Sequence, residues 1–323
     1  MIPSKSDFRI IFMGTPEFAV ESLRALVEGG YNVAGVVTNP DKPAGRGRRI
    51  KESAVKAYAR ENGLKLLQPH NLKDDAFARD LQKLDPSLQV VVAFKILPVS
   101  IFEIPQYGTF NLHASLLPDY RGAAPINHAI INGEEKTGVT TFFLDRQVDT
   151  GQIIKQKETP IEPDDNAGSL HDKLMVAGSE LVAETVEAIR TGRYSTTSQQ
   201  ELIRGDEPPK KAPKIFKEDC KIKWCRPGQE VHNFIRGLSP YPAAWTELTN
   251  GDSLTMKIYR ARPERKEHGH PCGSLHSDHK SYLKVATRDG YIYLDEVQQS
   301  GKKRMSVGEF LKGFRNITEF QCR

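Results

Sequence analysis

Asn111 and His113 are separated by one residue, and a loop that contains Pro and Gly follows them. If Gly108–His113 forms a strand, side chains two residues apart point to the same face, so this amide and this imidazole lie together. The strand would end at His113, which puts both groups at a carboxyl edge, where open α/β sheets bind ligands. An amide N–H and an imidazolium N–H that converge on one point are suited to stabilising an oxyanion.

The same pair has a plainer explanation. An isolated Asn-X-His is more often two structural side chains that bond to their neighbours. A serine nucleophile would be expected in an exposed elbow such as G-x-S-x-G, and the chain has none near this pair. Ser115 is the nearest hydroxyl, and its surroundings do not indicate a Ser–His triad.

A carboxylate strengthens the catalytic interpretation. Asp149 stands before Thr150 and Gly151 at another predicted strand–turn edge, and this sharper turn favours it over Asp145. A carboxylate beside His113 would stabilise the charged imidazolium and could relay a proton. An Asn, a His and an Asp without a metal motif suit acyl transfer to an amine through a tetrahedral intermediate.

The elements that must position these residues follow from apolar periodicity. Short apolar runs alternate with helical patterns over the first two hundred residues, which predicts βαβ units and a Rossmann-like, mostly parallel sheet. The predicted strands are 9–13, 33–37, 64–67, 88–94 and 108–113, with a further strand pair at 137–144 and 151–161. The predicted helices are 18–28, 52–62, 74–84, 125–134 and 169–192.

The pattern changes after Gly192. Residues 193–214 are polar and contain three prolines, so they indicate a linker. Residues 215–323 show short strands punctuated by Gly, Asp and Asn, which predicts a small OB-like β-barrel with one or two helices. We therefore expect a catalytic domain over 1–192, a linker over 193–214 and a C-terminal domain over 215–323.

Charge is distributed unevenly along the chain. The net charge of all 323 residues is +5, whereas the part from Glu207 onward has 22 Lys and Arg against 14 Asp and Glu, a net charge of +8. A basic module attached to a mildly acidic one suggests a polyanionic partner. A solvated lysine-rich surface would give the same count.

Several classes of protein are disfavoured. No apolar run reaches the roughly 18 residues of a membrane span, and the N-terminus lacks a signal-peptide cleavage pattern. The four cysteines form no CxxC and no zinc-ligand spacing, so we expect reduced thiols, no metal and a cytoplasmic protein. The turn after residues 9–13 has only Gly14 of the dinucleotide fingerprint, with Pro16 at the expected helix start, so a nicotinamide cofactor is disfavoured.

A loop with five basic residues follows the second predicted strand. Residues 39–53 contain Lys42, Arg46, Arg48, Arg49 and Lys51 among prolines and glycines. Flexible arginine can follow a phosphate backbone or stack on an unpaired base. Taken alone, the loop is more often a solvated surface, because basic loops of this kind are common.

These motifs together resemble a known family. "FNLHASLLPDYRGAAPI" followed by "DTG" resembles the folate-dependent formyltransferases, and "MGTPEFAV" with "NPDKPAGRGRR" is similar to their methionyl-tRNA branch. "APKIFKED" and "IRGLSPYPAAW" resemble that branch's C-terminal domain. The similarity extends over essentially the whole chain.

The resemblance implies a co-substrate, a partner and roles for individual residues. It implies a Rossmann-like domain that binds 10-formyltetrahydrofolate and an OB-like domain that helps to hold initiator methionyl-tRNA, with neither an obligate protein partner nor a membrane. It makes Asn111, His113 and Asp149 the catalytic set. It also places the folate-contacting loop at Ser115, Leu116, Leu117 and Pro118 and assigns tRNA contact to Lys42, Arg46, Arg48, Arg49 and Lys51, with Arg46 near the acceptor end.

Two positions depart from the family's usual sequence. "VVAFKILP" around Phe94 and Lys95 is one residue short, and Gln147 stands where glycine is frequent. Both lie near the expected pterin pocket. Two other functions remain open: a formyltransferase acting on glycinamide ribonucleotide or an amino sugar nucleotide, and a non-catalytic RNA-binding protein. The basic segments disfavour the first, and the complete Asn/His/Asp set disfavours the second.

Overall fold

The structure is a computed structural model that describes residues 2–44, 49–203, 205, 207–314 and 316–323. The chain forms two compact units that interleave along the sequence. The first unit comprises Met1–Gly122, Thr137–Pro160 and His171–Lys211. The second comprises Ala123–Lys136, Ile161–Leu170 and Ala212–Arg323. Whether 1–192 and 215–323 are separate domains stays a prediction.

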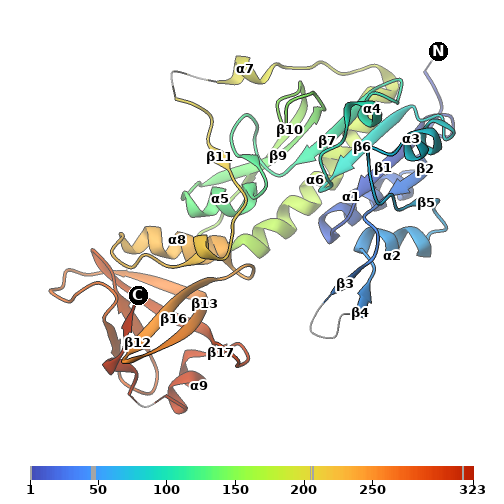
Figure 1. Cartoon of the computed structure of the whole chain (residues 1–323). Coiled ribbons are helices and arrows are strands. Elements are labelled where there is room, and N and C mark those ends of the chain that lie inside the picture. The colour runs from blue at the N-terminus through green and yellow to red at the C-terminus, as the bar shows by residue number, and fades with distance from the viewer. Residues whose placement is uncertain (1, 45–48, 204, 206, 315) are drawn as a thin grey trace. The chain divides into compact units, whose positions relative to one another are not determined.

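A seven-stranded sheet organises the first unit (Figure 1), in the order β10-β9-β7-β6-β1-β2-β5. Its strands are β1 (Arg9–Gly14), β2 (Asn32–Val37), β5 (Leu66–Leu67), β6 (Leu88–Val92), β7 (Thr109–His113), β9 (Lys136–Phe143) and β10 (Ile153–Pro160). The pairs β1–β2, β1–β6, β2–β5 and β6–β7 are parallel, and β9 runs antiparallel to β7. The predicted Rossmann-like, mostly parallel sheet is confirmed.

Helices lie between successive parallel strands of this sheet, as βαβ units require. They are α1 (Glu17–Glu28), α2 (Ala54–Glu61), α3 (Asp75–Gln82) and α4 (Val99–Phe102), whereas α6 (Ala167–Thr191) and α7 (Gln199–Leu202) follow β10 in the sequence. α6 begins in the second unit and continues into the first. A short antiparallel hairpin, β3 (Lys42–Ala44) and β4 (Arg49–Lys51), follows β2. Pro16 is the N-cap of α1, one position before the expected place.

Strand alternation separates the two faces of the sheet. Ile11, Met13 and Val91 are buried in one apolar cluster with residues of α3 and α4. Asn111 pairs in register with Val91 and faces the same side, because facing residues of adjacent strands share a face. Leu112 points the opposite way: a side chain at Gly178 of α6 would meet it at 2.7 Å. Asn111 and Leu112 therefore lie on opposite faces of the sheet.

The second unit is built on an antiparallel barrel. Its sheet runs β14-β15-β16-β13-β12-β18, with β17 paired to β16. A bridge between Ser274, which precedes β14, and Gln321 in β18 links the two edges and nearly closes the sheet. The strands are β12 (Ala244–Asn250), β13 (Asp252–Arg265), β14 (Leu275–Ser277), β15 (Leu283–Ala286), β16 (Gly290–Gln299), β17 (Met305–Ser306) and β18 (Gln321–Cys322). The predicted small C-terminal barrel is confirmed.

Two helices from distant parts of the sequence pack together in the second unit. α5 (Pro125–Ile131) approaches α8 (Gly228–Leu238) at Gly237, where an added Cβ would lie 2.6 Å from Ile131. The Asn127 amide donates to the Gly237 carbonyl at 2.7 Å. The remaining elements are α9 (Val307–Lys312), the 3-10 turns η1 (Glu218–Cys220) and η2 (Ile317–Glu319), and the short strands β8 (Arg121–Gly122) and β11 (Lys211–Ala212).

Candidate active site

A pocket of about 240 Å³ in the first unit contains two of the three predicted catalytic residues. Asn111 and Asp149 line it together, from the end of β7 and from the turn before β10. Its apolar lining comes from β6 and the segment after it, from α4 and from the residue after β9, namely Val91, Phe94, Ile96, Leu97, Phe102 and Leu144. Lys95 and Gln147 also line it, so both departures from the family sequence lie at this pocket. An apolar slot with polar groups on one side fits a flat heterocycle such as a pterin.

His113 lies just beyond the pocket lining and is only 7% exposed. Its Nε2 is 2.9 Å from the Tyr120 carbonyl oxygen. A carbonyl only accepts, so Nε2 carries a proton in this arrangement, and Nδ1 is the nitrogen whose state changes with charge. A protonated ring would then offer Nδ1–H as a second donor.

Asp149 occupies a conformation that few non-glycine residues adopt. Its φ of 57° lies in the left-handed region, which side chains with a Cβ disfavour. Its Oδ2 accepts a hydrogen bond from the Gly122 N–H at 3.1 Å. Within the described part of the chain, Asp149 and His113 share no hydrogen bond, and the catalytic role of either residue stays a prediction. Both are instead held by the backbone of the segment 120–122.

Gln199 fixes the turn that carries Asp149. This side chain is 2% exposed, although it lies in the segment predicted as a linker. Its Nε2 donates to the Asp149 carbonyl at 3.0 Å and to the Gly151 carbonyl at 2.9 Å. Its Oε1 accepts from Arg121 Nε at 2.9 Å and Nη2 at 2.6 Å. One buried amide therefore ties the Asp149 turn to the segment that holds His113.

The predicted folate loop, Ser115–Pro118, is also firmly held. Thr140 Oγ1 donates to the Ser115 carbonyl at 2.6 Å and accepts from the Leu117 N–H at 3.1 Å. Gln156 donates to the Leu117 carbonyl at 2.9 Å. The Ser115 hydroxyl donates to the Asp119 carbonyl at 2.7 Å, so it is engaged in loop structure. Leu116, Leu117 and Pro118 are not among the residues that line the Asn111 pocket.

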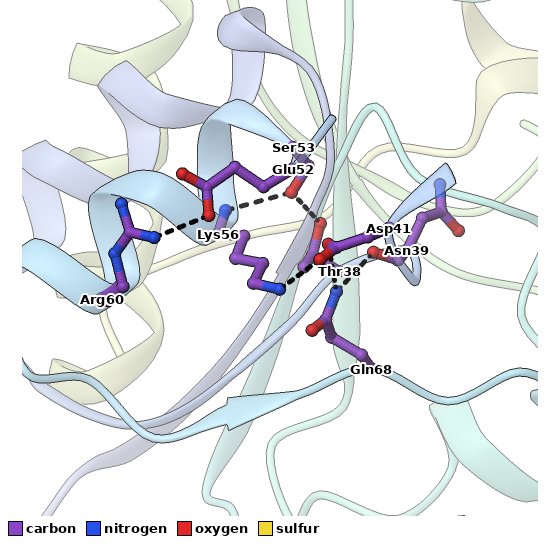
Figure 2. Close-up of polar contacts among 8 residues, drawn as sticks. All are labelled: Thr38, Asn39, Asp41, Glu52, Ser53, Lys56, Arg60 and Gln68. Atoms are coloured by element: carbon purple, nitrogen blue, oxygen red, sulfur yellow. Dashed lines mark hydrogen bonds and ion pairs between the residues drawn. The ribbon is translucent and has the colours of Figure 1, made fainter. Parts of the chain in front are cut away.

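The basic hairpin β3–β4 is anchored at its base by a polar network (Figure 2). Lys56 of α2 pairs with Asp41 Oδ2 at 2.6 Å, and Gln68 donates to Asp41 Oδ1 at 3.1 Å. The hydrogen bond from Lys56, and to a smaller extent that from Gln68, lowers the pKa of the Asp41 carboxyl below its ordinary value. Ser53 caps α2 by accepting from the Lys56 N–H at 3.0 Å, and its hydroxyl lies 2.8 Å from that of Thr38.

The predicted tRNA-binding residues occupy the hairpin that this network anchors. The backbones of Lys42, Arg49 and Lys51 belong to β3 and β4. Arg46 and Arg48 lie outside the described residues. Their assignment to tRNA stays a prediction.

Sequence reasoning missed Gln199 and Arg121 as parts of the site. A signal for α7 was present, because Ser198 is followed three residues later by Glu201, a helix-start pattern. Ser198 does cap α7, accepting from the Gln200 N–H at 3.3 Å. No pattern in the neighbouring sequence indicates that the Gln199 side chain bonds to residues 121, 149 and 151.

Two negative findings apply to the described residues only. None of their helices combines the length and apolar character needed to cross a bilayer. Nor do their His, Cys, Asp and Glu side chains form a group of three or more arranged to hold a metal ion.

Family models cover most of the chain. A formyl transferase model matches residues 8–186, and a model of the formyl transferase C-terminal domain matches residues 214–315. A methionyl-tRNA formyltransferase of Parabacteroides distasonis is 54% identical over 98% of this chain and 98% of its own length. One of Flavobacterium johnsoniae is also 54% identical, over 94% of this chain and 96% of its own.

Solved structures share the fold at lower identity. WlaRD, a sugar 3N-formyl transferase, aligns with a TM-score of 0.64 and 22% identity, over 92% of this chain and 99% of its own. A Helicobacter canadensis N-formyltransferase aligns with a TM-score of 0.64 and 21% identity, over 90% of this chain and 98% of its own. At these identities the structures support the fold, whereas the near relatives and the two matched models identify the family. The chain belongs to the formyltransferase family, in its methionyl-tRNA formyltransferase branch.

Proposed function

We propose that this enzyme transfers the formyl group of 10-formyltetrahydrofolate to the free α-amine of methionyl-tRNA, giving the formylated initiator for translation. The observation that carries the site assignment is that Asn111 and Asp149 line one pocket beside a buried His113. The reaction takes place in the cytoplasm, where charged tRNA is used, and needs no obligate protein partner.

The pocket fits the folate co-substrate in the chemistry of its lining. Phe94, Leu97 and Phe102 supply apolar walls for a planar ring, and Asn111 and Gln147 supply amide groups that can pair with its polar edge. When bound, the folate supplies the activated formyl group. The loop Ser115–Pro118 is the proposed contact for the rest of that molecule.

Asn111 and His113 stabilise the oxyanion that develops on the formyl oxygen. The Asn111 amide donates from within the pocket. His113 keeps Nε2–H on the Tyr120 carbonyl and donates from Nδ1 when the ring is protonated. Donors fixed before the reaction need no reorganisation as charge develops, which is why they lower the barrier.

Asp149 accepts the proton that the attacking amine loses, directly or through one water. As the bond between the formyl carbon and the folate nitrogen breaks, His113 or a water returns a proton to that nitrogen. The Asp149 carboxylate is held by the Gly122 N–H, and its backbone by Gln199. Arg121 completes this support by binding the other end of the Gln199 amide. Gln199 and Arg121 are therefore positioning residues in this scheme.

The hairpin β3–β4 is the proposed tRNA contact of the first unit, through Lys42, Arg46, Arg48, Arg49 and Lys51. Its net positive charge suits a phosphate backbone. Arg46 is assigned to the acceptor end, because a flexible guanidinium can stack on an unpaired base. The network around Asp41 supports this role by anchoring the hairpin base.

The test is a competition between acceptors. The full chain is incubated with radiolabelled formyl-folate, initiator methionyl-tRNA, glycinamide ribonucleotide and an amino sugar nucleotide, and the labelled product is identified. Label on methionyl-tRNA alone is the expected result. Label on a small-molecule acceptor would assign the chain to another formyltransferase activity, and absence of transfer with retained tRNA binding would indicate a non-catalytic RNA-binding protein.

A further inference from the structure

A second cavity lies within the second unit and belongs to neither the folate pocket nor the basic hairpin. It encloses about 440 Å³, which is within the size range of ligand pockets. Apolar side chains line it, among them Ala124, Ile215, Pro242 and Ala243. We call it the Tyr241 pocket, after the aromatic residue at its rim.

Tyr241 is presented to solvent to a degree that is unusual for an aromatic residue. It is 83% exposed. Pro240 and Pro242 flank it, and proline restricts the backbone on both sides, so little conformational freedom is left to lose on binding. A rigid exposed ring of this kind is a stacking surface more than a packing element.

A second aromatic wall comes from Trp245. Its Nε1–H is already used, donating to the Lys217 carbonyl at 2.8 Å, which fixes the plane of the indole. Lys221 Nζ lies over this indole, 5.3 Å from the ring centroid. The pocket lining therefore combines apolar side chains with the exposed Tyr241 ring and a partly buried indole.

Three lysines surround these aromatic faces: Lys214, Lys217 and Lys257 line the pocket. Among the described residues none of the three ammonium groups has a carboxylate partner, although Lys221 nearby is paired with Glu247. Lys257 donates one hydrogen bond to the Pro242 carbonyl at 3.2 Å, which leaves it two further N–H donors. Lys214 lies 5.2 Å from the centroid of the Phe216 ring.

No described lining residue opposes this positive charge. None is Asp or Glu, and the one thiol, Cys220, is buried at the cavity floor. Burial raises the pKa of the Cys220 thiol, so it stays neutral. The lining thus combines apolar, aromatic and cationic side chains and contains no carboxylate.

We propose that the Tyr241 pocket holds one unpaired nucleotide of the tRNA, with its base stacked on Tyr241 and its phosphates bound by Lys214, Lys217 and Lys257. The inference rests on the tRNA substrate of the proposed function. Unpaired bases are recognised by stacking on aromatic side chains beside a cationic track for the backbone. The net charge of +8 beyond Glu207 matches the same partner.

Other occupants fit this chemistry less well. An apolar peptide would use the floor but leave three ammonium groups without anions. A duplex would use the lysines but keep its bases stacked inside, away from Tyr241. A flexible, single-stranded part of a nucleic acid offers a free base and adjacent phosphates together.

The first experiment compares Tyr241→Ala with Tyr241→Phe in the full chain. Because base stacking on an aromatic ring contributes to affinity, the Ala variant should bind initiator methionyl-tRNA about fivefold more weakly or worse. The Phe variant should remain within about twofold of the unchanged chain, since it keeps the ring. Equal affinity of the Ala variant and the unchanged chain would overturn the proposal. Tyr241 is too exposed for its loss to disturb folding, and an unchanged unfolding temperature checks this.

The second experiment concerns the lysines and uses a charge-matched control. Lys217→Gln should weaken tRNA binding and reduce the slope of log Kd against log salt by about one unit. Lys223→Gln, an exposed lysine outside the pocket lining, should change the slope little. If both variants lose tRNA affinity equally, the lysines attract tRNA only through their general positive charge, and the pocket is not a nucleotide site.

Turnover at saturating tRNA separates this inference from the proposed function. The Tyr241→Ala chain should keep its kcat while its KM for tRNA rises. If the unchanged chain does not formylate methionyl-tRNA, the proposed function fails. If it does, and Tyr241→Ala has an unchanged tRNA Kd, only the pocket assignment fails.

Discussion

At the scale of single residues, the site is organised by backbone groups that hold its side chains apart from one another. His113 is bonded to the Tyr120 carbonyl and Asp149 to the Gly122 N–H, so one short segment fixes both. This arrangement keeps an imidazole donor and a carboxylate in the same small region without neutralising either in a direct pair. Catalysis of acyl transfer needs both: a donor for the oxyanion and an acceptor for the amine proton.

The first prediction concerns Asn111. Asn111→Asp keeps the shape of the side chain but replaces its N–H donors with an anion, so it should lose at least as much activity as Asn111→Ala. We expect kcat to fall by about 100-fold or more in both, the size typical for loss of an oxyanion donor. His113→Ala should show a similar loss. The kcat of each variant is measured by transfer of a radiolabelled formyl group at saturating substrate concentrations. The Kd for tRNA is the control and should stay constant.

The second prediction concerns Gln199. Gln199→Ala releases the Asp149 turn from its two hydrogen bonds, and the left-handed conformation of Asp149 then lacks support. We expect kcat to fall by about tenfold, roughly 1.4 kcal/mol in the barrier, with both KM values nearly unchanged. Gln199→Glu should be equally poor, because a carboxylate can keep Arg121 but cannot donate to the two carbonyls.

A double-mutant cycle distinguishes positioning from a general loss of stability. In an Asp149→Asn background, Gln199→Ala should cause little further loss, since the group that it positions no longer acts. If the two losses multiply, Gln199 does not act through Asp149. The unfolding temperature of each variant is measured alongside.

At the scale of elements, the hairpin β3–β4 is attached to the sheet by side chains from three segments. Asp41 precedes β3, Lys56 comes from α2 and Gln68 follows β5, and their contacts meet at one carboxylate (Figure 2). The Lys56 and Asp41 side chains are mostly shielded from solvent, at 20% and 27% exposure, so this ion pair is worth more than a fully solvated one. The network thus connects the segment before the hairpin to α2 and to the residue after β5.

The third prediction follows from this anchor. Lys56→Met keeps most of the aliphatic side chain but removes the partner of Asp41, so the hairpin base should loosen. We expect KM for tRNA to rise severalfold while KM for formyl-folate stays constant. Lys83→Met removes another lysine from an ion pair, with Asp80 on α3, and serves as the control. Equal effects of the two substitutions on tRNA would show that only net charge matters.

At the scale of the whole molecule, the two units interleave, and this changes what a truncation would do. α5 precedes β9 in sequence, yet it packs on α8 in the second unit, as does the segment Ile161–Leu170, whose Asp165 carbonyl accepts from Arg236 at 2.9 Å. A chain that ends at Lys211 keeps α5 but loses α8.

We therefore expect the chain truncated at Lys211 to unfold at a lower temperature and to aggregate, in addition to binding tRNA weakly. A soluble truncated chain with the full unfolding temperature would contradict this.

The fourth prediction tests the α5–α8 contact in the intact chain. Gly→Ala inside a helix usually gains up to about 1 kcal/mol. In Gly237→Ala, however, the new methyl group would lie 2.6 Å from Ile131, and overpacking of this kind costs about 1–3 kcal/mol. Gly237→Ala should therefore lower the free energy of unfolding. Gly308→Ala in α9, where the nearest atom would be 3.9 Å away, should be neutral or stabilising. Urea unfolding of both variants measures their free energies of unfolding. A loss in Gly237→Ala alone would show that overpacking against Ile131 outweighs the higher helix propensity of alanine.

The sequence by itself determined the features that depend on local periodicity and spacing. Period-two alternation put Asn111 and His113 on one face, and Thr150–Gly151 marked the turn at Asp149. The alternating apolar runs predicted the parallel sheet, and the turn-rich C-terminal part predicted the barrel. These features can be predicted from the sequence because each depends on residues that are only a few positions apart.

The tertiary structure alone decided which distant segments meet. It buried Gln199 against Arg121, 78 residues earlier, and against the Asp149 turn, although its own segment is polar and proline-rich. It placed α5 with α8 and anchored the basic hairpin through Asp41. The hydrogen-bond partner of a polar side chain cannot be predicted from the local sequence when that partner is distant along the chain. The two groups come together only when the sheet and the barrel have folded.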